Sequence, residues 1–93
     1  MYVVNKYEYP LFIKDIEGVD AKISKHCSLM DFHKQEDAVK WAKLRAKVIQ
    51  RLLAANYKDK KFNVVVENDN IVKLFFKEDN VNYIIIKYEI VAN

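Results

Sequence analysis

Apolar and polar positions alternate along both ends of the chain, which is the two-residue period of a half-buried β-strand. In the N-terminal part, residues 2–9 and 11–16 are rich in β-branched and aromatic types and predict two strands, and residues 21–24 predict a short third one. In the C-terminal part, the same pattern predicts strands at residues 62–67, 71–77 and 83–91. Short polar connections rich in Asn and Asp separate these last three strands and favour antiparallel hairpins.

Residues 36–55 follow a period of 3.6 residues instead and predict one amphipathic helix. The segment has no Gly or Pro, and Glu36 and Asp37 place negative charge in the first turn, where the helix dipole favours it. Its apolar arc consists of Ala38, Val39, Ala42, Ala46, Ile49, Leu52 and Leu53, with Trp41 and Val48 at the margin. Arg45 falls inside this arc, and the three alanines predict a close approach of the helix to the sheet.

Together these elements predict an α+β fold, in which a single amphipathic helix packs on a five- or six-stranded antiparallel sheet in the order ββ(β)-α-βββ. Ninety-three residues form one domain, residues 1–93, and 52% hydrophobic residues are enough for its core. Because the chain has one Gly and one Pro, Asn and Asp must supply the left-handed turn conformations. Pro10 lacks a backbone donor and is expected at a strand end or a sheet edge.

The last three predicted strands have apolar residues on both faces. One face is apolar throughout and is assigned to the core beneath the helix: Phe62, Val64, Val66, Val72, Leu74, Phe76, Ile84, Ile86, Tyr88 and Ile90. The opposite face supplies the candidates for a protein interface: Phe75, Tyr83, Ile85, Lys73, Lys77 and Lys87. Aromatic and cationic residues together are typical of interface centres, so we expect a second surface to cover this face. That surface is a protein partner or a second copy of the chain, the chain's own N-terminal hairpin, or single-stranded nucleic acid stacked on the aromatic rings.

Positive charge is concentrated in one segment. Residues 40–61 include eight basic residues and one acid, a local charge of +7, whereas the whole chain has a net charge of +3. On the polar side of the predicted helix, Lys40, Lys43, Lys47 and Arg51 form a stripe about 16 Å long. Such a stripe can follow a phosphate backbone, and nucleic-acid binding is therefore the alternative function. The candidate residues are Lys40, Lys43, Lys47, Arg51, Lys58, Lys60 and Lys61.

Residues with catalytic or metal-binding chemistry are few and poorly spaced. His26, Cys27 and His33 match neither the paired spacing of a structural zinc site nor a three-ligand catalytic site. The carboxylates Asp15, Glu17 and Asp20 surround a turn at Gly18 and are expected to be solvated. A chain with one Gly has no phosphate-binding loop. We therefore expect no metal, no cofactor, no small-molecule substrate and no enzymatic activity.

The sequence also predicts a cytoplasmic protein without a membrane segment. The first residues lack the long apolar core of a signal peptide, and no apolar run is long enough to span a bilayer. The single cysteine, Cys27, excludes an intramolecular disulfide and suits a reducing compartment.

The N-terminal half resembles small uncharacterised accessory proteins of Gram-positive bacteriophages and prophages. The resemblance rests on residues 2–4 and 12–15, on Asp31-Phe32, and on Glu36-Asp37-Ala38 at the helix start. Those proteins have a Ser or Thr at the helix cap, whereas this chain has Lys34, which has no oxygen acceptor for capping. The resemblance implies an accessory phage protein that acts in the host bacterial cytoplasm, for example against a host-defence system, and it implies no reaction. Together with the apolar strand face, it leads us to expect a non-enzymatic protein that binds a protein target or itself through Phe75, Tyr83 and Ile85.

Overall fold

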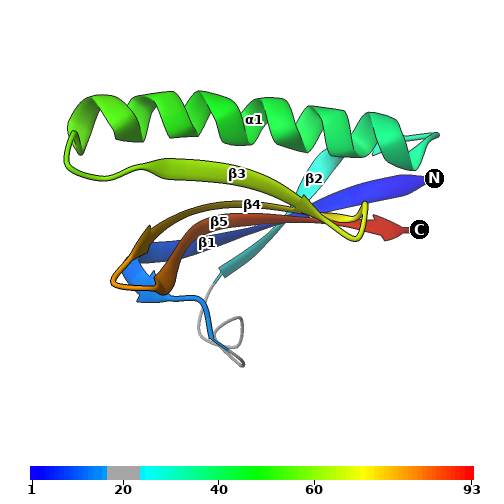
Figure 1. The fold of residues 1–93 in the computed structure, drawn as a ribbon. Helices are drawn as coiled ribbons and strands as arrows, with labels where there is room; N and C mark the ends of the chain where they lie inside the picture. The colour runs from blue at the N-terminus through cyan, green and yellow to red at the C-terminus, as the bar shows by residue number, and fades with distance from the viewer. Residues whose placement is uncertain (17–23) are drawn as a thin grey trace.

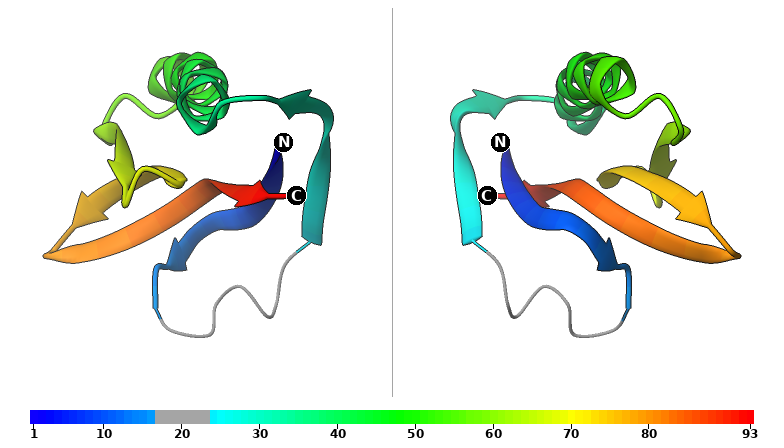
Figure 2. Two further views of the ribbon diagram at one scale, coloured as in Figure 1. Left: turned by 90° about the vertical axis from the view of Figure 1, so that its right-hand side faces the viewer. Right: turned by 90° about the vertical axis from the view of Figure 1, so that its left-hand side faces the viewer.

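The computed structural model describes residues 1–16 and 24–93 and confirms the α+β architecture (Figure 1). Its elements are β1 (Tyr2–Lys14), β2 (Ser24–Phe32), α1 (Gln35–Asn56), β3 (Phe62–Glu67), β4 (Ile71–Glu78) and β5 (Val81–Ala92). The five strands form one antiparallel sheet in the order β2-β1-β5-β4-β3. Helix α1 lies over one face of this sheet, and the two chain ends lie side by side (Figure 2).

The N-terminal strands differ from the prediction. Residues 2–9 and 11–16 do not form two strands, because one strand, β1, runs from Tyr2 to Lys14 between β2 and β5. Pro10 was expected at a strand end or a sheet edge, but it lies inside β1. It falls between Glu8 and Ile13, where the pairing with β5 is shifted, so the hydrogen-bond ladder does not need the backbone donor that Pro lacks.

The edge strand β2 was missed by the sequence patterns. Of the predicted strand at residues 21–24, only Ser24 lies within the described residues, where it begins β2. Residues 24–28 are Ser-Lys-His-Cys-Ser, which have weak intrinsic strand preference, and they become a strand because they pair with β1. His26 and Cys27 therefore lie on a strand.

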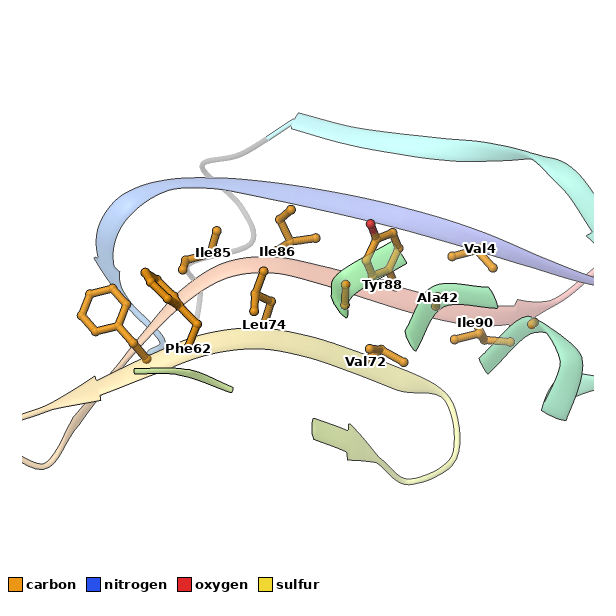
Figure 3. Packing of buried hydrophobic residues seen from close by; sticks show 12 residues of the cluster. Val4, Ala42, Phe62, Val72, Leu74, Ile85, Ile86, Tyr88 and Ile90 are labelled. Carbon is orange, nitrogen blue, oxygen red and sulfur yellow. The ribbon is translucent and has the colours of Figure 1, made fainter. Parts of the chain in front are cut away.

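The helix begins and ends within one residue of the prediction, and its alanines contact the sheet as expected. Lys34 precedes the helix without a capping side-chain hydrogen bond. Ala38, Ala42 and Ala46 are fully buried, which allows the helix backbone to approach β4 and β5 closely (Figure 3). These small residues bring the sheet's larger aliphatic side chains directly beneath α1.

Two glutamine side chains attach the helix to strand β3. Gln35 Nε2, in the first turn of α1, donates a 2.8 Å hydrogen bond to the carbonyl of Asp69, just after β3. Gln50 Nε2, near the other end, donates a 2.7 Å hydrogen bond to the carbonyl of Phe62 at the start of β3. Because the attachments lie at opposite ends of α1, they fix both its position along β3 and its rotation about its own axis.

A bulge in β5 changes which residues face the helix. Leu74 pairs with Ile86, but the next pair is Phe75 with Ile84, so Ile85 is an extra residue that reverses the alternation toward the start of β5. Ile85 and Ile86 both join the core beneath α1 (Figure 3). Ile84, which the strict alternation assigned to this core, belongs instead to a second cluster on the opposite face.

The hairpin turns use the residue types that the composition requires. Asn68 and Asp69 connect β3 to β4, and Asp79 and Asn80 connect β4 to β5, all four with φ between 52° and 63°. These are left-handed conformations that Asn and Asp tolerate better than other non-Gly residues, so the expectation for the turns is confirmed.

Replacing Ala42 by Leu tests the close packing of α1. The larger side chain has no space between helix and sheet, and we expect a loss of about 1–3 kcal/mol in the free energy of unfolding, measured by urea denaturation. The matched control is Ala55→Leu, at an exposed position of the same helix, which is expected to change stability by less than about 0.5 kcal/mol. Equal effects of the two substitutions would contradict the packing.

Candidate protein-binding surface

The sheet face opposite the helix does not bring the predicted interface residues together. Ile85 is only 5% exposed and packs in the core beneath α1. Tyr83 also lies on the helix side, where its ring stacks on Phe76 at 5.0 Å and 11°. Of the three apolar candidates only Phe75 remains on the opposite face, half-buried. The prediction failed because strict alternation was carried through the bulge at Ile85.

Side chains of the neighbouring strand β1 surround the apolar centre of this opposite face. Ile84 is 1% exposed, and the residues that pack around it are Tyr9, Tyr7 and Ile13 of β1. The sequence left open a cover by an N-terminal hairpin, but the side chains that bury Ile84 come from β1, which lies beside β5 in the same sheet and forms no hairpin over it. Among the side chains that the structure describes, this face does not provide the broad apolar surface expected from the sequence.

The lysines of the opposite face are engaged by neighbouring side chains. Lys73 and Lys87 are directly paired across β4 and β5, an arrangement of like charges that is unfavourable without compensation. Lys73 Nζ lies 3.1 Å from Asp15 Oδ2 and 3.0 Å from Glu67 Oε1, and the Lys87 ammonium lies 4.6 Å from the Tyr7 ring centroid. Lys77, at the end of β4, is exposed.

The outward face of α1 has the apolar stripe that the sheet lacks. Leu44, Val48 and Leu52 are 66%, 56% and 61% exposed. Their spacing of four residues places them on successive turns, each about 40° further around the helix. The assignment of Leu52 to the buried arc was wrong, because packing through the alanines turns it away from the sheet, and Leu44 was assigned to neither face. We call Leu44, Val48 and Leu52 the helix stripe.

Aromatic contacts hold the residues beside the helix stripe. The centroid of the Trp41 ring lies 5.9 Å from that of Phe32 in β2 and 6.3 Å from that of Tyr88 in β5. Arg45, which the sequence placed inside the buried arc, is exposed and its guanidinium lies 5.0 Å from the Trp41 ring centroid. These contacts fix the side of α1 that faces β2, as Gln50 fixes the side that faces β3.

The basic residues proposed for nucleic-acid binding divide into two groups. Lys40, Lys43, Lys47 and Arg51 are exposed on α1, alongside the helix stripe. Lys60 is half-buried, because its ammonium lies 3.2 Å from Glu78 Oε2 and 4.9 Å from the Phe76 ring centroid, so it does not extend the exposed basic surface. Lys58 and Lys61 are exposed in the loop before β3. An uninterrupted row of cations is therefore not observed.

The remaining candidates are not brought together among the side chains that the structure describes, and those of His26 and Cys27 lie outside that part. His33 is exposed between β2 and α1, Asp15 is paired with Lys73, and Glu17 and Asp20 lie outside the described residues. In residues 1–16 and 24–93, the side chains of 11, 12 and 24–29 apart, no group of three or more His, Cys, Asp or Glu is placed to hold a metal ion. Over the same ranges, no helix combines the length and apolar character needed to cross a membrane.

Comparison with known proteins returned no match, whether to a family model, to a curated protein or to a solved structure.

Buried and paired groups make the fold sensitive to alkaline pH. Burial lowers the pKa of Lys73, but hydrogen bonds to Glu67 and Asp15 outweigh this effect and raise it above the ordinary 10.5. Burial raises the pKa of Tyr88 above the ordinary 10.0, partly offset by Arg45. For both groups the folded state therefore holds the proton more tightly than the unfolded chain. Their contribution to stability is complete below the unfolded pKa values and is lost as the pH rises through the folded ones.

We therefore expect the free energy of unfolding to fall above about pH 10, measured by urea denaturation at several pH values. Tyr88→Phe and Lys73→Met should each make this fall shallower. Lys77→Met removes the same charge at an exposed position of β4, and the free energy of unfolding of this variant should fall with pH as steeply as that of the wild type. A stability that stays constant through this pH range would show that the two groups do not contribute as described.

Proposed function

We propose that this chain is a non-enzymatic accessory protein that acts by binding another protein through the outward face of α1, with the helix stripe at the centre of the contact. The observation that supports this proposal is the exposure of Leu44, Val48 and Leu52, each more than half accessible on one line of a rigidly held helix. Large exposed aliphatic groups that recur at the helical spacing are typical of surfaces that dock a partner.

The proposed mechanism is the binding of a partner to a preformed surface. The two glutamine attachments and the Trp41 contacts hold α1 on the sheet before any partner arrives, so little order has to be gained on binding. The partner removes the three aliphatic side chains from water, and the surrounding lysines and arginine form a polar rim. In the setting that the phage resemblance suggests, the partner is a host protein in the bacterial cytoplasm.

Two alternatives are less well supported. Nucleic-acid binding uses the same lysines, but three aliphatic side chains along the helix offer no ring on which a base could stack and no donor for a phosphate. Symmetric self-association through this face would bring two basic helices together, which charge repulsion opposes. The protein-binding proposal uses both the aliphatic and the charged residues of the face.

Site-specific photo-crosslinking inside a Gram-positive bacterium tests the proposal. With p-benzoyl-phenylalanine in place of Val48, we expect discrete adducts with another protein that survive nuclease treatment. The comparison position is Lys77, which is also exposed but lies near the end of β4, outside the helix stripe. Adducts from position 48 should disappear when Leu44→Gln and Leu52→Gln are added. Adducts only from position 77, or only with nucleic acid or with this chain itself, would contradict the proposal.

A further inference from the structure

The charges around the helix stripe specify the kind of partner it fits. From Ala38 to Asn56 the chain has no acidic residue, and five basic residues lie on or beside the outward face of α1. These are Lys40, Lys43, Arg45, Lys47 and Arg51. The acids Glu36 and Asp37 are confined to the first turn. Beyond the first turn of α1, a partner that covers Leu44, Val48 and Leu52 therefore meets only positive charges among the charged residues of the helix.

The basic residues lie on both sides of the helix stripe. With about 100° per residue, Lys40, Lys47 and Arg51 fall within about 60° of Leu44 on one side. Arg45 falls about 20° beyond Leu52 on the other side, where it is held over the Trp41 ring. The aliphatic row therefore runs between two basic borders over about 12 Å, which is just over two helical turns.

Resting on the proposed function, we propose that α1 binds an acidic amphipathic helix of the partner protein. The partner helix places aliphatic side chains at positions i, i+4 and i+8 against the helix stripe and Asp or Glu residues at both edges of that row. The aliphatic contacts exclude water, and the carboxylates meet Lys47 and Arg51 on one side and Arg45 on the other. The combination of aliphatic and anionic side chains distinguishes this partner from a nucleic acid, which has no row of aliphatic groups.

An anionic membrane surface is the other ligand that combines acyl chains with negative charge, and it is less well matched. Helices that lie in a membrane interface use Trp and a broad apolar face to enter the lipid. Here Trp41 packs on Phe32 and Tyr88, and the broad apolar face of α1 is occupied by the sheet. On the outward face of α1, the three aliphatic side chains of the helix stripe form a narrow row, whose width suits contact with one other helix.

Three synthetic peptides, each stapled into a helix, test this inference on the intact protein. The first has leucines at i, i+4 and i+8 flanked by glutamates, the second has the same leucines flanked by lysines, and the third has the glutamates with the leucines replaced by glutamines. Binding is measured by the fluorescence of Trp41, the single tryptophan of the chain, and by the anisotropy of a labelled peptide. We expect the first peptide to bind at least tenfold more tightly than either of the others.

Matched variants separate the charge from the apolar contact. Lys47→Glu/Arg51→Glu should weaken binding of the first peptide about tenfold, whereas Lys58→Glu/Lys61→Glu, an equal charge change in the loop before β3, should weaken it less than threefold. Leu44→Gln/Leu52→Gln should also weaken it at least tenfold, with the circular dichroism spectrum unchanged. All three variants alter only exposed side chains.

The outcomes that overturn this inference differ from those that overturn the proposed function. Equal binding of the glutamate and lysine peptides, or binding of neither peptide while Val48 still crosslinks to a protein, would refute an acidic partner helix and leave protein binding through α1 intact. If Leu44→Gln/Leu52→Gln abolishes neither peptide binding nor the crosslink, both proposals are wrong. Tight binding of an anionic phospholipid vesicle or of a DNA oligonucleotide, with no peptide binding, would assign the face to a different class of ligand.

Discussion

The close contact between α1 and the sheet is the constraint on which the rest of the structure depends. Alanine is the smallest residue type of the helix, and Ala38, Ala42 and Ala46 let β4 and β5 approach the helix backbone. The Val, Leu and Ile side chains of these two strands fill the space between helix and sheet. Once the alanine row faces the sheet, the positions of all other helix residues are determined. Leu44, Val48 and Leu52 then point away from the core, although each is as apolar as the residues that are buried.

This constraint connects the packing of the helix to the function proposed for it. A helix rotated to bury the helix stripe would instead turn its alanine row outward together with Val39 and Leu53, and the stripe would not be available to a partner. The observed rotation places aliphatic groups among lysines and arginine, a combination that suits an acidic amphipathic partner better. The hydrogen bonds of Gln35 and Gln50 and the ring contacts of Trp41 oppose a change in this rotation.

Much of the fold could be predicted from the sequence, because it depends on local patterns. The helix, the three C-terminal strands and the left-handed Asn and Asp turns follow from periodicity and residue type. The bulge at Ile85 could not be predicted, since it arises from how β5 pairs with β4, and it exchanged the faces of Ile84 and Tyr83. The edge strand β2 depends on its pairing with β1 in the same way. The helix stripe had a sequence signal, the four-residue spacing of Leu44, Val48 and Leu52, but the broad apolar arc obscured it.

Solvent accessibility of individual methyl groups tests the rotation of α1 most directly. In a methyl-labelled sample, a soluble paramagnetic agent broadens NMR signals in proportion to their exposure. We predict strong broadening for Leu44, Val48 and Leu52 and almost none for Leu74 and Val72, which are fully buried. If the methyl groups of Leu52 and Val48 were as protected as those of Leu74, the helix would be rotated toward the sheet and the binding surface described here would not exist.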